Sequence, residues 1–160
     1  MRVGISSPSH LFANLDNIQF EDEPVDQMTQ IIVVPGDYHD VLLLDQFELE
    51  VPTGASILGL TVEIRRAGND SVADDSVRIV KGGRVGEAER ALAAVWSEDL
   101  TWVTYGGSED LWGEDWTAEN LTAADFGVAF STSYTLAAGN TRAYVDAVKV
   151  TVRYEVSCDE

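Results

Sequence analysis

Apolar and polar residues alternate along much of this chain, which is the pattern of a β-strand with one buried face. The pattern is clearest near the C-terminus, where Tyr144, Val148, Val152 and the other residues of the same parity up to Val156 are expected to share one face. A second alternating run covers residues 58–65. Shorter β-branched or apolar runs, most of them ending near glycine or proline, lie at residues 29–34, 41–51, 76–81, 102–105 and 126–130. This series of short strands with almost no helix predicts an all-β fold, an antiparallel β-sandwich or jelly roll.

The pattern divides the chain into one domain and two flanking segments. Residues 1–28 scatter their apolar side chains without a sustained period, which predicts an irregular N-terminal arm. Residues 29–156 form the single β-sandwich domain, and residues 157–160 form a C-terminal tail. Within the domain, residues 117–124 predict one helical turn. The alanine-rich stretch at residues 87–94 is compatible with a helical turn or with an excursion along a strand edge.

The composition is globular but strongly acidic. The 160 residues carry 28 acidic and 10 basic side chains, a formal net charge of −18. This charge repels phosphate backbones and anionic headgroups, so neither nucleic acid nor membrane is an expected partner. No apolar run approaches the ~18 residues of a membrane span, and residues 1–8 lack the apolar core of a secretory signal. The acidity fits either a surface that stays soluble at high local concentration or a saline habitat, and composition does not choose between them.

Few residues offer a nitrogen or sulfur atom for catalysis or metal binding. The chain contains two histidines, His10 and His39, and one cysteine, Cys158. These three residues cannot supply a usual zinc ligand set, and no serine lies in a nucleophile elbow. We therefore expect no zinc site, no catalytic triad and no cofactor.

Oxygen ligands for calcium are more plentiful. A polar loop is expected at residues 68–75, and the chain offers two acidic clusters, Asn69, Asp70, Ser71, Asp74 and Asp75 in that loop and Asp37 with Asp40 before it. Neither cluster has the spaced ligands and terminal glutamate of a calcium-binding loop. Solvated loop carboxylates are therefore the favoured interpretation, and no bound metal is expected.

Acidic and aromatic residues gather between positions 102 and 116. Glu109–Asp110 and Glu114–Asp115 lie among tryptophans, but glycoside hydrolysis needs one carboxyl group whose pKa is raised in an apolar cleft. The aromatic residues in this stretch could stack on sugar rings or plug one end of a sandwich as a structural corner, and the second interpretation is favoured. They are Trp102, Tyr105, Trp112 and Trp116.

Several stretches resemble a β-sandwich module of tailed-phage and prophage proteins. Residues 51–64 (VPTGASILGLTVEI) resemble its strand "IPxGAxIxGIxVEI", and residues 77–83 (VRIVKGG) resemble its strand "VxLVKGG". Residues 105–117 (YGGSEDLWGEDWT) resemble its signature "YGGxxDLWGxxWT". Residues 126–129 and 145–154 resemble its closing strands, in the same order along the chain.

The resemblance implies a non-enzymatic part of a virion, and no catalytic residues come with it. A single domain with an arm is expected of a capsid decoration (cement) protein on the capsid exterior. Its expected partners are the major capsid protein or another virion protein, together with further copies of itself. A tail or fibre component that recognises host carbohydrate through the four aromatic residues is the alternative. The first 50 residues match the module poorly.

Overall fold

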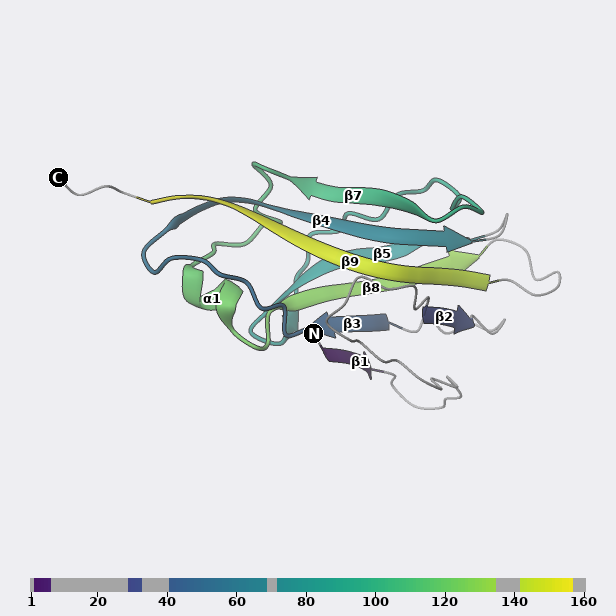
Figure 1. The fold of residues 1–160 in the computed structure, drawn as a ribbon, viewed down its shortest axis with the longest axis horizontal. Coiled ribbons are helices and arrows are strands. Elements are labelled where there is room, and N and C mark those ends of the chain that lie inside the picture. Colours follow the sequence, from purple (N-terminus) through teal and green to yellow (C-terminus); the bar gives the residue numbers. More distant parts are fainter. Residues whose placement is uncertain (1, 7–28, 33–40, 69–71, 135–141, 157–160) are drawn as a thin grey trace.

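A computed structural model describes residues 2–6, 29–32, 41–68, 72–134 and 142–156. Its strands form two antiparallel sheets that pack face to face (Figure 1). The larger sheet has the order β1-β3-β8-β5-β6, and the smaller sheet has the order β2-β9-β4-β7. The elements are β1 (Arg2–Ser6), β2 (Thr29–Ile32), β3 (Val41–Asp45), β4 (Ser56–Gly68), β5 (Val72–Lys81), β6 (Arg84–Val85), β7 (Thr101–Gly107), α1 (Ala118–Thr122), β8 (Gly127–Tyr134) and β9 (Arg142–Glu155). The prediction of an all-β, antiparallel sandwich is confirmed.

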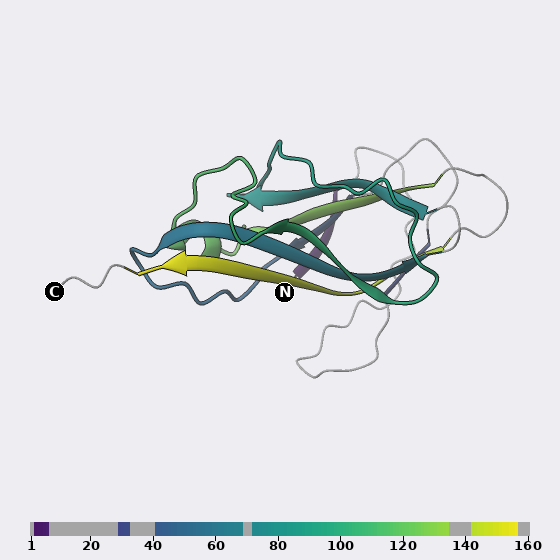
Figure 2. The ribbon, with the colours of Figure 1, turned by 90° about the horizontal axis from the view of Figure 1, so that it is seen from above.

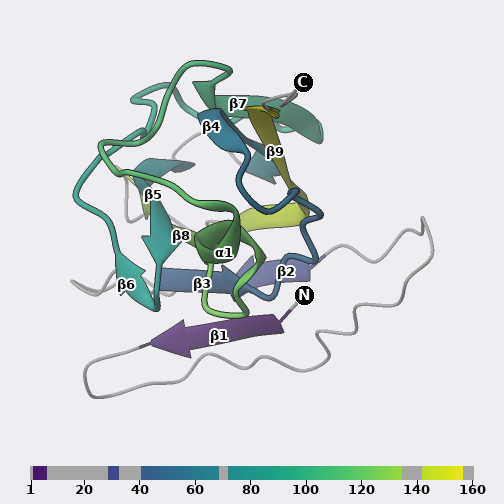
Figure 3. The ribbon, with the colours of Figure 1, turned by 90° about the vertical axis from the view of Figure 1, so that its left-hand side faces the viewer.

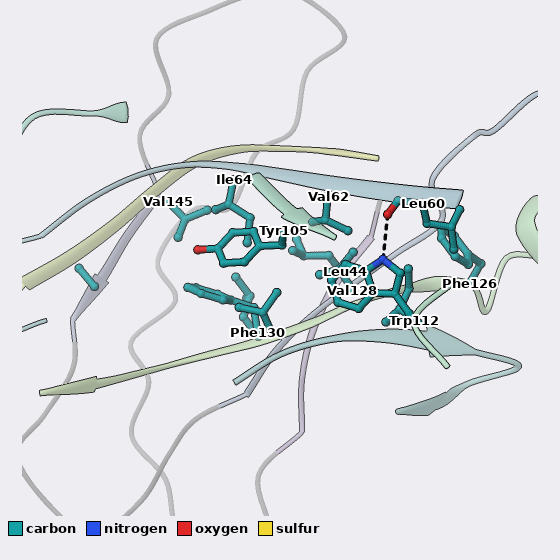
Figure 4. Packing of buried hydrophobic residues seen from close by; sticks show 14 of the residues in the cluster. Leu44, Leu60, Val62, Ile64, Tyr105, Trp112, Phe126, Val128, Phe130 and Val145 are labelled. Carbon is teal, nitrogen blue, oxygen red and sulfur yellow. Dashed lines mark hydrogen bonds between the residues drawn. The ribbon is translucent and has the colours of Figure 1, made fainter. Parts of the chain in front are cut away.

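Alternate side chains of β4 form the centre of the core. Leu60, Val62 and Ile64 are completely buried, and each such side chain contributes about 1.5–3 kcal/mol by leaving water. They face the larger sheet, where Val128 and Phe130 are buried opposite them (Figure 4). The two long strands β4 and β9 run side by side across the smaller sheet (Figure 2). Leu60, Val62 and Ile64 of the predicted alternation therefore form the inner face of the sandwich. The prediction that Leu58 shares this face was wrong, because the pairing with β9 shifts register between Ile57 and Gly59 and Ile57 packs against the core instead.

The face of β9 changes at a β-bulge. The pairing of β9 with β4 shifts register near the start of β9 and leaves Asp146 as the extra residue. Beyond this point Val148 and every second residue up to Val152 pack against the core, whereas before it the inward residues are Ala143 and Val145. The prediction that Tyr144 shares the face of Val148 was wrong, because one inserted residue moves a side chain to the opposite face.

The strand predicted at residues 41–51 ends at Asp45. Gln46 has a φ of 58°, and this left-handed conformation turns the chain out of the ladder. Phe47, Leu49 and Val51 still pack against the core as their alternation predicted, but without strand pairing. The alternation of inward and outward side chains thus continues beyond the residue at which strand pairing ends.

The polar loop predicted at residues 68–75 is largely strand. β4 continues to Gly68 and β5 begins at Val72, so Asp74 and Asp75 belong to β5. The prediction was wrong because two consecutive acidic residues are typical of a solvated loop. Here Asp74 instead faces the interior and is only 7% exposed. Residues 69–71 lie outside the described part of the chain.

The N-terminal region contributes two strands. Arg2–Ser6 belongs to the predicted irregular arm, yet it pairs antiparallel with β3 as β1. A run this short shows no period in the sequence, and the free edge of β3 provides its partner. β2 covers the first part of the strand predicted at residues 29–34. The rest of the arm (residues 7–28), residues 33–40 and the C-terminal tail lie outside the described residues.

The single helical turn predicted at residues 117–124 is confirmed as α1. Thr117 caps it, because its hydroxyl accepts the N–H of Asn120 and the Asn120 side chain accepts the N–H of Thr117. The helix lies at one end of the sandwich, next to the open ends of the two sheets (Figure 3). In the part of the chain that the structure describes, no helix has the length and apolar composition needed to cross a membrane.

Candidate functional site

The four aromatic residues singled out in the sequence do not share a surface. Tyr105, Trp112 and Trp116 are buried, with exposed fractions of 2%, 1% and 8%. Trp102 alone is exposed, at 50%, on the outer face of β7. A continuous stacking platform for sugar rings therefore does not form from these four side chains.

Trp112 and Trp116 close one end of the sandwich. The Trp112 indole Nε1 donates to the Leu60 carbonyl oxygen at 2.9 Å, as the dashed line in Figure 4 shows. The Trp116 Nε1 donates to the Leu111 carbonyl oxygen at 2.9 Å, and its ring meets the Phe126 ring edge-on with centroids 5.6 Å apart. Both indole N–H groups are thus satisfied within the fold, as buried tryptophans require.

The backbone around Trp112 is shaped to admit its indole ring. Gly106 has a φ of 70°, and a Cβ there would lie 2.6 Å from the Trp112 Nε1 atom and 2.7 Å from the Leu60 carbonyl oxygen. Trp112 itself has a φ of 55° and Gly113 a φ of 68°. The stretch Tyr105–Thr117, whose residues carry the signature in the sequence, is therefore used to build this corner.

Two carboxylates of this stretch, Asp110 and Glu114, form short ion pairs. Asp110 binds Arg90 through two hydrogen bonds of 2.7 and 2.9 Å and also accepts the Trp112 N–H. The hydrogen bond from Arg90 lowers the pKa of Asp110, more than partial burial raises it. Glu114 pairs with Arg84 at 2.8 Å. Asp110 therefore lacks the raised pKa that a general acid for glycoside hydrolysis needs.

A shallow, open hollow of about 540 Å³ lies beside this corner. Its walls are Arg84, Glu87, Ala88, Trp112, Gly113 and Glu114. Arg84 and Glu114 bind each other, so these two charged side chains of the hollow are partnered within the protein, and the third, Glu87, is exposed.

A buried polar cluster joins the two sheets, and the sequence analysis did not predict it. Arg66 of β4 and Asp74 of β5 lie 3.5 Å apart, with side chains 5% and 0% exposed. The Tyr105 hydroxyl accepts from Arg66 Nε at 2.9 Å and donates to Asp74 at 3.0 Å. The Trp96 Nε1 also donates to Asp74, at 2.9 Å. A signal was present in the sequence, since Arg66 follows Leu60, Val62 and Ile64 at the next inward position.

The surroundings of the cluster complete its hydrogen bonding. The Leu92 N–H donates to the second Asp74 oxygen at 2.9 Å, and the Arg66 guanidinium lies 4.4 Å from the centre of the Trp96 ring. Burial, and next the nearby Asp74 charge, raises the pKa of Tyr105 well above its ordinary value. Tyr105 therefore stays protonated, and the cluster holds the two sheets together.

Glu89 closes part of the edge of β5. Its carboxylate accepts the Val77 N–H at 2.6 Å, the Ser76 hydroxyl at 2.7 Å, Arg78 Nε at 2.9 Å and the Ala91 N–H at 3.0 Å. Partial burial alone would raise the pKa of Glu89, but these hydrogen bonds outweigh it and lower the pKa from 4.5 to about 2. A side chain thus takes the place of a neighbouring strand.

We expect Glu89→Gln to lower the free energy of unfolding by about 1–2 kcal/mol at pH 7, because it removes a charged acceptor that is partly screened by solvent. The folded-state pKa is depressed, so the contribution of the carboxylate is complete above pH 4.5 and disappears as the pH falls towards 2. Urea unfolding of both proteins at pH 7, 5 and 3 measures this difference. The exposed Glu87→Gln serves as control and should change stability by less than about 0.5 kcal/mol. A loss for Glu89→Gln that does not vary with pH would contradict the assignment.

The acidic clusters considered for calcium are not assembled among the described residues. Asp74 is committed to Arg66, Tyr105 and Trp96, and Asp75 accepts the Ser131 hydroxyl at 2.8 Å. Within the described ranges, no group of three or more histidine, cysteine, aspartate or glutamate side chains is placed to hold a metal ion. The other candidates lie outside these ranges, and they are Asp37, Asp40, Asn69, Asp70, Ser71, His10, His39 and Cys158.

The stretches that resemble the phage module lie in strands of both sheets and in the tryptophan corner. Residues 51–64 lead into β4, residues 77–83 end β5, and residues 105–117 form the tryptophan corner. Residues 126–129 and 145–154 lie in β8 and β9 or just before them. No family model, no curated protein and no solved structure matches the chain.

Proposed function

We propose that this protein is a non-enzymatic structural component of a tailed-phage virion, and specifically a decoration protein on the capsid exterior. The observation that carries the proposal is the use made of residues 105–117, where the resemblance to the phage module is most distinctive. Tyr105, Asp110, Trp112 and Trp116 each satisfy their polar atoms within the fold. Because the polar atoms of this motif are bound inside the fold, the motif supports a structural module better than a ligand-binding one.

The electrostatics support the same proposal. Asp110 and Glu114 at the tryptophan corner are held in ion pairs, and the pKa of Asp110 is lowered, which does not suit a general acid. A net charge of −18 keeps decorated particles apart in solution. Binding to the major capsid protein then depends on local apolar and main-chain contacts rather than on overall attraction. Copies bound around symmetric capsomers would brace them against internal pressure.

Immunogold labelling of intact particles tests the location. We expect antibody against this chain to label the heads of particles from the phage that encodes it. Unlabelled heads beside labelled tails would overturn the capsid assignment while keeping a virion role. Particles without any label would overturn the virion role itself.

A tail or fibre component is the second candidate, and one observation favours it. Trp102 is half-exposed on β7, with the Lys149 ammonium 5.6 Å from its ring centre, an arrangement that leaves an aromatic face near solvent. Carbohydrate recognition would depend on this residue alone of the four aromatic residues, because the others are buried. Under this alternative Trp102→Ala abolishes binding of the purified protein to host glycans and leaves its melting temperature unchanged.

A further inference from the structure

The outer edge of β7 carries main-chain groups that no described segment pairs. β7 is the last strand of the smaller sheet, with β4 on its inner side (Figure 1). In an antiparallel pair, each residue directs its N–H and C=O to the same side, and neighbouring residues point to opposite sides. The register of β4 with β7 therefore decides which groups face outward.

Two contacts identify that register. The Leu60 N–H donates to the Asp110 carbonyl oxygen, and the Gly68 N–H donates to the Ser97 carbonyl oxygen, so even-numbered residues of β4 point towards the β7 side. Val62 and Ile64 consequently bond their partners Tyr105 and Val103. Thr104 lies between these partners and Trp102 lies one residue before Val103, so both direct their N–H and C=O groups away from the sheet.

The chain treats the edge of β5 differently. There, Gly86, Arg90 and Trp96 donate their N–H groups to β5 carbonyl oxygens, and the Glu89 carboxylate accepts the Val77 N–H. The edge of β5 is thus covered by an irregular segment and a charged side chain. Monomeric proteins prevent strand addition in this way.

The composition of β7 offers none of this protection. Its sequence, TWVTYGG, contains no charged residue and no proline, and it is rich in residues that favour strands. Trp102 and Thr104 are exposed on the outer face beside the open edge. An edge of this kind is a template for a further strand.

Charge at the two ends of β7 restricts what can be added. Glu98 and Asp99 precede the strand, and Glu109 follows it with its side chain 87% exposed, in a solvent-exposed ion pair of 3.5 Å with Arg153. Pairing with β7 of a second copy, in either direction, brings acids of one copy beside acids of the other, and each copy carries a net charge of −18. An added strand with lysine or arginine near its ends instead places basic side chains beside these acids, which is favourable.

We infer that the edge of β7 is a docking site for an extended segment of a different protein, an uncharged β-strand flanked by basic residues, which pairs with Trp102 and Thr104. For the identity of that partner the inference rests on the proposed function, which makes it a protein of the capsid. The chemistry of recognition, main-chain pairing with β7 by a strand that has basic residues at its ends, does not depend on the proposed function.

Thr104→Pro removes the outward N–H without breaking a bond to β4, since proline is tolerated at such edge positions. Thr104→Val keeps the N–H and the shape of the side chain and is the matched control. Melting curves establish that both variants are folded. Capsids of the phage that encodes the chain, assembled without it, are then incubated with each protein, and bound copies are counted after sedimentation. We expect Thr104→Pro to lose at least tenfold in affinity and Thr104→Val to bind like the wild type.

Equal binding of all three proteins would overturn the docking site and leave the proposed function intact. If the wild-type protein itself does not bind capsids, the proposed capsid role fails. Binding at the edge of β7 is then tested with a peptide of alternating valine and threonine flanked by lysines. Shifts of the Trp102 and Thr104 amide signals with this peptide, at least tenfold weaker with glutamate flanks, would support the site. Unchanged amide signals would overturn it. A wild-type protein that dimerises and a Thr104→Pro variant that does not would make a second copy the occupant, against the inference.

Discussion

Replacing Asp74 with asparagine should lower the free energy of unfolding by about 3–5 kcal/mol, because it leaves the buried Arg66 guanidinium without an opposite charge. Arg66 is 4% exposed, so water cannot replace the lost partner. The substitution also weakens the acceptor for the Trp96 indole and the Tyr105 hydroxyl. Urea unfolding followed by tryptophan fluorescence measures the change.

Two further variants separate this effect from the loss of a negative charge as such. Glu98→Gln removes a charge from an exposed position and should change stability by less than about 0.5 kcal/mol. The double variant Arg66→Met with Asp74→Asn removes both charges and should regain part of the loss, because no unpaired ion remains in the interior. A double variant less stable than Asp74→Asn alone would show that Arg66 stabilises the fold mainly through its contacts with Trp96 and Tyr105.

Gly59→Ala is the second change with a large expected effect. A Cβ at Gly59 would lie 2.3 Å from the carbonyl carbon of Ser108 and 2.6 Å from the main-chain nitrogen of Glu109. These are backbone atoms, so the segment after β7 would have to move away from β4. We expect a loss of about 3 kcal/mol, the upper part of the usual range for overpacking, and a fall in melting temperature.

Gly107→Ala provides the matched control for this prediction. Gly107 lies in β7 opposite Leu60, and no atom approaches within 4 Å of the position its Cβ would take. The same substitution there should leave stability within about 0.5 kcal/mol of the wild type. Equal melting temperatures for the two variants would contradict the close approach at Gly59.

The parts of the fold that depend on neighbours in the sequence were predictable. The alternation at residues 60–64 identified the inner face of β4, and Thr117 and Asn120 identified the start of α1. Each of these signals is a repeat or a cap within a few residues of itself. Alternation and caps need no knowledge of what lies across the core.

The polar features of the interior were not predictable in this way. Asp74 appeared to belong to a solvated loop because its partners Trp96 and Tyr105 lie 22 and 31 residues away in the chain. The role of Glu89 depends on main-chain groups of β5 that become available only when the segment after β6 turns back along that strand. Of the candidate aromatic residues, Trp102 could not be distinguished from the buried three by composition or spacing.

From the order of residues alone it follows that the chain forms strands with one apolar face, that these strands make a sandwich, and that the protein is strongly acidic. Folding in three dimensions sets which charges enter the core, where the face of β9 changes, and that the outer edge of β7 stays open among the described residues. The physical reason is range, since side-chain periodicity is written into consecutive residues. Ion pairing, bulges and edge protection depend instead on groups that folding brings together from distant parts of the chain.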